Sequence, residues 1–327
     1  MRAALVVLGG IVGAALVPLA SLPPSPAAAQ TCVAQTLTIP LRNAEPLVVE
    51  AGGIAADGAG NIYAVSNFPG SQALLRFNSS GAQTLTILPA AATPNFEIPE
   101  GIAADAAGNI YAADPFVKTL YRFTASGVQT LAIPATNATP NLAAPDAMAV
   151  DGAGNIYTAD SGTQTLYRFN ASGVQTLAIP ASTASPPITG GLAGIAVDGA
   201  GNIYTGGFGN NTVYRFNSSG VQTLAIPPTS ASPNLVALTA VASDVAGNIY
   251  VVDSSTETLY RFDAGGVQTL AIPATSASPN LVGPSEIAAD AAGNIYTVAG
   301  PVILYRFATF ACPAAPAAIV TTPSFTG

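Results

Sequence analysis

Residues 101–114 read Gly-Ile-Ala-Ala-Asp-Ala-Ala-Gly-Asn-Ile-Tyr-Ala-Ala-Asp, and close variants of this stretch recur along the chain. Its centre, Gly-Asn-Ile-Tyr, occurs six times, with the glycine at positions 60, 108, 154, 201, 247 and 293. Successive copies are therefore 46 to 48 residues apart. Self-similarity at such a period indicates a repeat architecture in which each copy forms one supersecondary unit.

Each unit is typical of four short strands. The unit at 194–227 has an apolar segment, Ile-Tyr-Thr, Thr-Val-Tyr-Arg-Phe and Val-Gln-Thr-Leu-Ala-Ile-Pro, separated by stretches such as Asp-Gly-Ala-Gly-Asn. Ile, Val, Thr, Tyr and Phe favour strands, whereas Gly, Asn, Asp and Ser favour tight turns. No part of the chain after residue 29 shows a helical apolar period. We therefore expect an all-β fold with four antiparallel strands per unit.

Four strands at a period near 46 residues match the blade of a β-propeller, and a stacked solenoid is the alternative. The two ends of the chain distinguish them. The sixth unit ends at 304–307 without its fourth strand, while a fourth-strand motif stands alone at 34–40. If residues 34–40 complete the last blade, no strand of that blade is left unpaired. The sequence thus predicts a six-bladed propeller closed by its own N-terminal strand.

The first 29 residues have the pattern of a signal peptide. Arg2 precedes an apolar run over 3–20, and Ala27-Ala28-Ala29 forms the small-residue cleavage site. A membrane anchor is the competing interpretation, but Gly9, Gly10, Gly13 and Pro18 interrupt the apolar run. We expect a signal peptide at 1–29, a propeller at 30–312 and a flexible tail at 313–327. The protein is thus predicted to be secreted, extracellular or periplasmic, with no membrane span in the mature chain.

Two cysteines flank the predicted closure. Cys32 lies just before the closing strand, and Cys312 follows the third strand of the sixth unit. In an exported chain, two cysteines are more typical of a disulfide than of metal ligands, and two free buried thiols are the alternative. We expect a Cys32–Cys312 disulfide that locks the ring.

The composition excludes several functions. Charged residues make up only 8% of the chain, and without Arg2 eight basic residues stand against 17 acidic ones. This balance repels phosphate backbones, so nucleic acid is excluded as a partner. The chain has no histidine, which excludes Ser-His-Asp triads, histidine acid–base catalysis and most zinc sites.

Every unit carries one aspartate after its first strand and one arginine in Tyr-Arg-Phe or its variant. One pair per blade predicts a structural role, either an ion pair or a turn cap, whereas a ring of arginines around an anion would bring like charges together at a cost. The Tyr and Phe beside each arginine are expected to pack between blades. The predicted structural residues are Asp57, Asp105, Asp151, Asp198, Asp244 and Asp290 with Arg76, Arg122, Arg168, Arg215, Arg261 and Arg306.

Residues that differ between units are the candidates for function, because a site on a symmetric scaffold breaks the symmetry. The connections from each fourth strand to the next first strand contain proline, differ from one another and are expected to line one face. Two sets of carboxylates are expected at the channel mouth on that face: Glu100, Asp146 and Glu286 at the starts of first strands, and Asp114, Asp160 and Asp253 at the ends of second strands. We expect no cofactor and interpret these carboxylates as solvated charges. Calcium, which binds oxygen ligands of this kind, is the alternative.

The stretches 101–114 and 194–204 resemble the NHL repeat, and the resemblance extends over all six units. After the second aspartate the sequence departs from the family pattern, since Thr163 and Thr165 stand where Asn and Arg are common and only Asn210 fits the Asn position. The resemblance implies a secreted bacterial NHL-like propeller. NHL-like propellers include ligand-binding domains of bacterial surface proteins, RNA-binding modules, lyases and lactonases. The lyase chemistry of such relatives depends on histidine, whereas the gluconolactonase-like group uses a channel calcium held by acidic and Asn residues.

The sequence favours a non-catalytic binding module, expected to be monomeric, whose loop-rich face binds an extracellular protein or glycan. A calcium-dependent lactonase-like hydrolase centred on Glu100, Asp146 and Glu286 is the first alternative. A structural component of the cell envelope is the second. Carboxylates that converge within coordination distance would favour the enzyme, and dispersed ones the binder.

Overall fold

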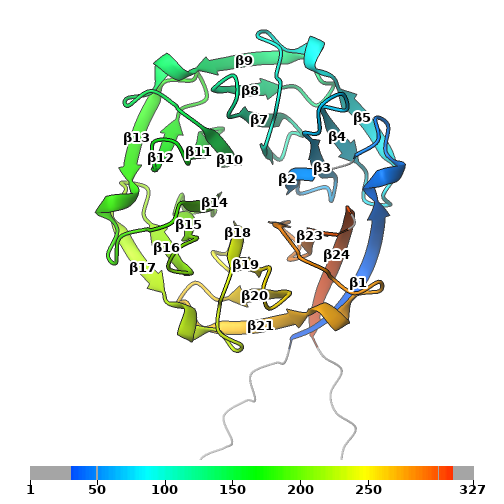
Figure 1. Ribbon diagram of the computed structural model, residues 1–327, viewed down its shortest axis with the longest axis vertical. Coiled ribbons are helices and arrows are strands. Elements are labelled where there is room, and N and C mark those ends of the chain that lie inside the picture. The colour runs from blue at the N-terminus through cyan, green and yellow to red at the C-terminus, as the bar shows by residue number, and fades with distance from the viewer. Residues whose placement is uncertain (1–30, 49–50, 301, 312–327) are drawn as a thin grey trace, which may run out of the picture.

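The computed structural model describes residues 31–48, 51–300 and 302–311 as six four-stranded antiparallel sheets around a central channel (Figure 1). The expected six-bladed propeller is therefore confirmed, and the solenoid is ruled out. The blades are, in ring order, β2 (Ala51–Ala56), β3 (Ile62–Ser66), β4 (Ala73–Phe77) and β5 (Gln83–Ile87); β6 (Gly101–Ala104), β7 (Ile110–Asp114), β8 (Thr119–Phe123) and β9 (Gln129–Pro134); β10 (Pro145–Val150), β11 (Ile156–Asp160), β12 (Thr165–Phe169) and β13 (Gln175–Pro180); β14 (Leu192–Val197), β15 (Ile203–Gly207), β16 (Thr212–Phe216) and β17 (Gln222–Ile226); β18 (Leu238–Ser243), β19 (Ile249–Asp253), β20 (Thr258–Phe262) and β21 (Gln268–Pro273); and β22 (Glu286–Ala289), β23 (Ile295–Ala299), β24 (Ile303–Ala311) and β1 (Thr31–Pro40).

Helices in the described part of the chain are limited to single 3₁₀ turns after the outer strands. None of them has the length and apolar character that crossing a membrane requires. They are η1 (Leu41–Asn43), η2 (Pro89–Ala91), η3 (Ala135–Asn137), η4 (Ala181–Thr183), η5 (Pro228–Ser230) and η6 (Ala274–Ser276).

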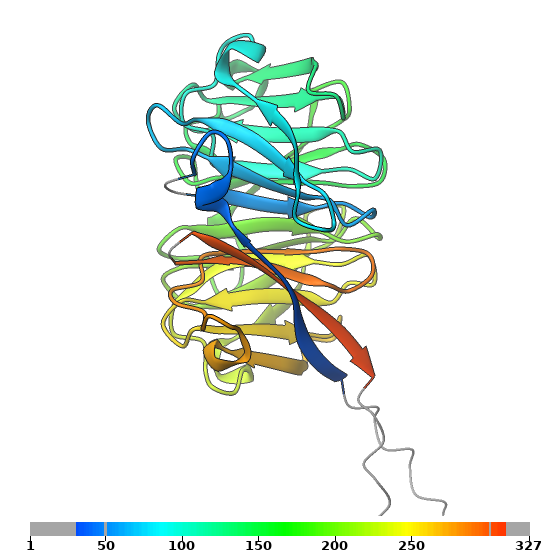
Figure 2. The same cartoon turned by 90° about the vertical axis from the view of Figure 1, so that its right-hand side faces the viewer.

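The ring is closed by β1, which pairs antiparallel with β24 as the outer strand of the sixth blade. The register places Thr38 opposite Tyr305 and Pro40 opposite Ile303, so the predicted closure by residues 34–40 is confirmed. The pairing also continues beyond the blade, to Thr31 opposite Ala311. The two strands leave the disc together as a twisted ribbon (Figure 2).

The predicted lock lies partly outside the described residues. Cys32 is opposite Phe310 in the β1–β24 ladder, two residues before Cys312, which is not described. The disulfide therefore stays a prediction. The expected signal peptide and tail also lie outside the described residues.

The repeated aspartate is a turn cap. In the first blade, Asp57 Oδ1 accepts hydrogen bonds from the backbone N–H groups of Ala59 and Asn61, both at 2.9 Å. Its Oδ2 accepts bonds from Asn61 Nδ2 and the Tyr63 hydroxyl, both at 2.8 Å. Gly60 completes the turn with a positive φ of 77°. The same four acceptor contacts recur in the other five blades, so the Asp-x-x-Gly-Asn-x-Tyr motif ties the first two strands together.

The repeated arginine joins neighbouring blades. Arg122 Nε donates to the hydroxyl of Thr130 in its own blade, at 2.9 Å, and its Nη1 donates to the carbonyl oxygen of Ala171 in the next blade, at 3.0 Å. Arg306 makes the equivalent bond to Ser79 O at 2.9 Å and so links the last blade to the first. The arginines therefore join neighbouring blades through uncharged hydrogen-bond partners. The repeated aspartates have the other role that was predicted, that of turn caps.

The hydrophobic core is divided into six clusters, one between each pair of neighbouring blades. Tyr121 and Phe123 lie in one cluster with their rings stacked at 6.2 Å between centroids, which confirms the expected packing of the Tyr-Arg-Phe motif. The inner strands approach closely where the residues are small. A Cβ on Gly101 would lie only 2.9 Å from Ala147 Cα of the next blade, so a larger residue there would force the blades apart.

Removing residues 30–40 tests the closure. The deletion exposes the edge of β24 and takes buried Ile39 from the cluster between the sixth and first blades. We expect a fall in melting temperature of well over 10 °C, since about 1 kcal/mol corresponds to roughly 2–4 °C in a domain of this size. A chain that ends at residue 312 is the control and should melt like the wild type; equal melting of both variants would refute the closure.

Mass spectrometry of the unreduced protein tests the lock. A peptide pair joined through Cys32 and Cys312 is expected, and the double variant Cys32→Ser/Cys312→Ser should lose up to about 5 kcal/mol of stability in the chain-entropy model. Two separately alkylated thiols in protein purified without reductant would show that the disulfide does not form.

Candidate functional site

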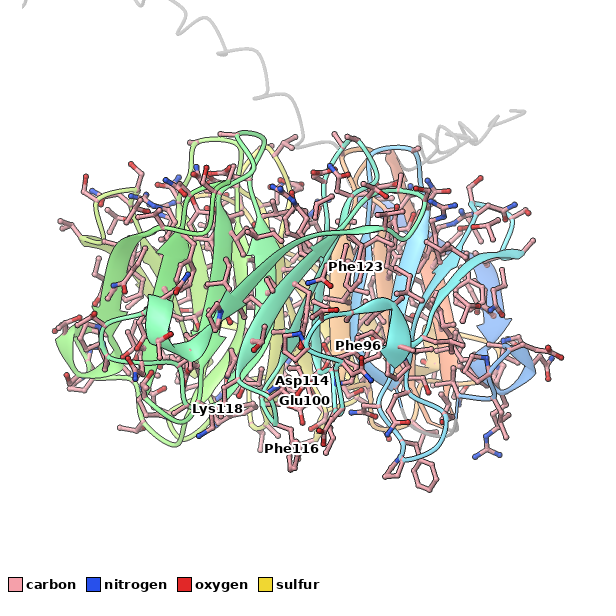
Figure 3. All side chains as sticks on the ribbon, turned by 90° about the horizontal axis from the view of Figure 1, so that it is seen from above. Phe96, Glu100, Asp114, Phe116, Lys118 and Phe123 are labelled. Carbon is pink, nitrogen blue, oxygen red and sulfur yellow. The ribbon has the colours of Figure 1, made fainter. Side chains whose placement is uncertain are left out.

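The disc has two unlike faces. We call the face that carries the connections between blades and the turns between second and third strands the loop face, and the opposite one the turn face. Side chains on the loop face include Glu100, Phe116 and Lys118, which lie together along one edge in Figure 3. The β1–β24 ribbon leaves from the turn face, because β24 runs from the loop face toward its end at Ala311. The loop face is therefore clear of the closure.

A cavity of about 330 Å³ lies at the channel mouth on the loop face. One apolar side chain from each blade lies on the cavity wall and also on the wall of a smaller cavity of about 120 Å³ further along the channel. We call these six residues the floor ring, because they separate the two cavities: Ile54, Ile102, Met148, Ile195, Val241 and Ile287. A volume of this size is at the small end of ligand pockets, roughly 300–1,000 Å³.

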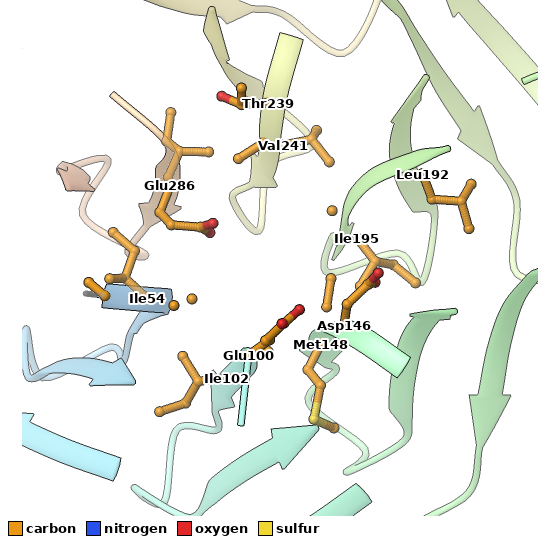
Figure 4. A pocket seen from close by; sticks show the side chains of 18 of the residues that line it. Ile54, Glu100, Ile102, Asp146, Met148, Leu192, Ile195, Thr239, Val241 and Glu286 are labelled. Atoms are coloured by element: carbon orange, nitrogen blue, oxygen red, sulfur yellow. The ribbon is translucent and has the colours of Figure 1, made fainter. Parts of the chain in front are cut away.

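Three carboxylates line the cavity: Glu100, Asp146 and Glu286, from the second, third and sixth blades (Figure 4). The structure thus brings together three of the six candidates from different blades. Their backbone is fixed by neighbouring strands. Glu100 N donates to Ala113 O at 3.0 Å, and the Thr297 hydroxyl donates to Glu286 O at 2.7 Å. The side chains project from rigid strand starts rather than from free loops.

The environment of the cavity raises the pKa of two of these groups. For Glu286, burial and then the charges of Glu100 and Asp146 raise the pKa to about 8. For Asp146, burial is again the first cause and Glu100 adds to it, while a hydrogen bond with Ser161 opposes the change; the pKa is raised to about 6. The cavity therefore favours a bound proton at neutral pH unless a cation enters it.

The carboxylates do not converge as metal ligands do. Within residues 31–48, 51–300 and 302–311, no group of three or more acidic or cysteine side chains is placed to hold a metal ion. Calcium takes six to eight oxygen ligands at 2.3–2.6 Å, so a dispersed set of three does not fit it well.

The other three candidates, Asp114, Asp160 and Asp253, have a different place. They are fully buried at the ends of β7, β11 and β19 and are not part of the cavity wall. Asp114 Oδ2 accepts bonds from the N–H groups of Glu97 and Ile98, and its Oδ1 accepts bonds from those of Phe116 and Val117. Asp160 and Asp253 accept equivalent backbone bonds. Because these lone pairs are engaged, the three aspartates hold the loops that surround the mouth.

Exposed aromatic side chains form a rim around the mouth that the sequence reasoning missed. Phe68, Phe116 and Phe208 lie in turns between second and third strands and are 43%, 61% and 45% exposed. Phe208 also lines the cavity. The third and fifth blades have Ser161 and Ser254 after the second strand instead. The available signal was the change of residue type at these equivalent turns. We call Phe68, Phe116 and Phe208 the phenylalanine rim.

A glutamine in each outer strand holds the loops of the loop face, and this role was also missed. Gln129 Oε1 accepts a bond from Thr93 N at 2.6 Å, and its Nε2 donates to Thr93 O at 3.0 Å. The same two-point contact joins Gln35 to Ser278 across the closure, at 2.6 and 3.2 Å. The connections between blades are therefore tied to the outer strands.

Comparison with solved structures gives propellers of several functions. A virginiamycin B lyase of Staphylococcus aureus is 16% identical with a TM-score of 0.56 and 80% of each chain covered. A gluconolactonase of Xanthomonas campestris is 16% identical, with a TM-score of 0.59, 80% of this chain and 87% of that chain covered. A chain of a nidogen/laminin complex is 18% identical, with a TM-score of 0.57, 79% and 97% covered. These similarities show the propeller fold. No protein-family model and no curated protein sequence matches the chain.

The raised pKa of Glu286 predicts a specific pH dependence. Its folded-state pKa of about 8 exceeds the ordinary glutamate value of about 4.3, so the favourable contribution of the protonated group is complete below pH 4.3 and is lost as the pH rises through 8. Glu286→Gln keeps the group neutral. Its melting temperature relative to the wild type should therefore increase by several degrees between pH 5 and pH 9.

Exposed Glu97 supplies the control for this measurement, because Glu97→Gln removes a carboxylate on the same face outside the cavity. Its melting temperature should differ from the wild type by the same amount at both pH values. A Glu286→Gln curve that runs parallel to the wild-type curve would contradict the raised pKa.

Proposed function

We propose that this protein is a secreted, non-catalytic NHL-like binding module whose loop face binds a protein partner. The observation that carries the proposal is the asymmetry of that face. Three phenylalanines are exposed around a cavity that holds three carboxylates, on a scaffold whose other repeated residues satisfy one another. Exposed aromatic groups around a concave centre are typical of binding surfaces.

A protein partner is favoured over a glycan by the aliphatic groups beside the rim. Leu47, Val236 and Val282 on the connecting loops are each more than half exposed. Such groups bury against apolar side chains, whereas sugars present mainly hydroxyl groups. The nidogen/laminin complex is a precedent for a propeller of this shape in a protein complex. The N-terminal pattern and the two cysteines support the secretion that we propose.

The alternative of a calcium-dependent lactonase has less support. Its basis was a converging set of carboxylates, and the described residues do not supply one. An assay of lactone hydrolysis with calcium and with a chelator addresses this alternative directly, and calcium-dependent turnover would replace our proposal with the enzyme.

Variants of the two faces test the binding surface. Phe68→Asp/Phe116→Asp alters the loop face, and Val128→Asp/Val174→Asp makes matched changes at turn-face valines that are 61% and 59% exposed. Partners that crosslink to the wild-type protein at the native cell surface should be lost from the loop-face variant, by tenfold or more, and kept by the turn-face variant. Equal capture by both variants, or binding of glycans alone on an array, would contradict a protein site on the loop face.

A further inference from the structure

We propose that the channel-mouth cavity binds a primary ammonium group at the end of an alkyl chain. The inference rests on the proposed function, because it names the chemical group that the loop face receives at its centre. The two sources of this group are a lysine side chain of a partner protein and a free alkylamine.

The cavity wall offers hydrogen-bond acceptors and negative charge. Glu100, Asp146 and Glu286 contribute carboxylates, and the wall contains no lysine or arginine. An anion would therefore be repelled by the ionised carboxylates. An ammonium group has three donors and one positive charge, which match an acceptor wall.

Two neutral acceptors on the same wall lack partners within the protein. Asn67 Oδ1 and Thr239 Oγ1 are buried atoms without a hydrogen bond to any described group, and both residues line the cavity. Buried polar atoms are usually satisfied, so an unpaired oxygen beside a cavity marks a place for a donor from outside. This observation is independent of the carboxylates, because the two residues come from the first and fifth blades.

The shape of the cavity fits a chain that enters from the rim. Phe208 lies at the mouth, the carboxylates lie on the wall, and the aliphatic floor ring closes the bottom. Methylene groups can pack against the phenylalanine while the ammonium group meets the wall. The floor ring then prevents deeper entry of a charged group, since its six side chains offer it no acceptor. The dispersed carboxylates suit a polyatomic cation better than a bare metal ion.

Charge accounts for why the site favours a cation. Three acidic groups share one cavity. The charges of Glu100 and Asp146 make Glu286 harder to ionise, and those of Glu100 and Asp160 make Asp146 harder to ionise. A bound ammonium group relieves this repulsion and promotes loss of the proton from Glu286. Binding should therefore tighten as the pH rises from 6 to 8.5 and should release protons.

Calorimetry with three probes tests the inference. Nα-acetyl-lysine-N-methylamide carries the charged side chain in a peptide setting, n-butylamine carries the same group free, and the Nε-acetylated lysine derivative is the neutral control. We expect the two charged probes to bind and the neutral one to bind at least tenfold more weakly. Tighter binding of the lysine derivative identifies a partner's lysine as the source, and tighter binding of butylamine identifies a free amine.

Variants separate the cavity from the surrounding face. Glu100→Gln and Asp146→Asn should each weaken the charged probes about tenfold or more, Asp146→Glu should restore part of the loss, and Glu97→Gln should have no effect. Melting temperatures no lower than that of the wild type show that the variants fold. Equal binding of charged and neutral probes, or no binding of either charged probe, would overturn the inference. If the Phe68→Asp/Phe116→Asp variant loses partner capture but the wild-type protein binds none of the probes, the loop-face proposal stands and only the ammonium site is rejected.

Discussion

The pairing of β1 with β24 is the constraint on which the rest of the structure depends. Residues separated by almost the whole chain form one antiparallel ladder, which completes the sixth sheet and covers its edge. The same strand supplies Ile39 to the core between the last and first blades, and Gln35 to the loop at Ser278. A ring closed in this way holds six first strands side by side around the channel.

Structure and function use different residues of the same repeat. The turn aspartate, the clamping arginine and the loop-binding glutamine recur in each blade and find their partners within the protein or its neighbour blade. They explain the fold and leave nothing free for a ligand. The residues that depart from the repeat include three carboxylates, two unpaired oxygens and an exposed phenylalanine rim. The repeated contacts stabilise the scaffold, and the residues that depart from the repeat lie on the loop face.

The repeat made the fold predictable, because the spacing of the copies and their turn residues are local features of the sequence. The fourth-strand motif at 34–40 could then complete only the sixth blade. The same alignment located Glu100, Asp146 and Glu286 at the mouth. It failed for Asp114, Asp160 and Asp253, since the pattern does not show that loop N–H groups engage their carboxylates. The phenylalanine rim was also missed, because exposure of an apolar residue depends on how a turn projects from the finished disc. Local periodicity thus predicts the scaffold, whereas the state of each side chain depends on tertiary contacts.

The central claim is that the closed ring creates a cavity in which neighbouring acidic groups raise the pKa of Glu286 and favour a positively charged ligand. The most direct test is an NMR titration of the side-chain carboxyl carbon of Glu286, assigned by comparison with Glu286→Gln. The account predicts an apparent pKa of about 8 for this group in the ligand-free protein. A value near the ordinary 4.3 of an exposed glutamate would contradict it, because the carboxylate would then be solvated and the cavity would not favour a cation.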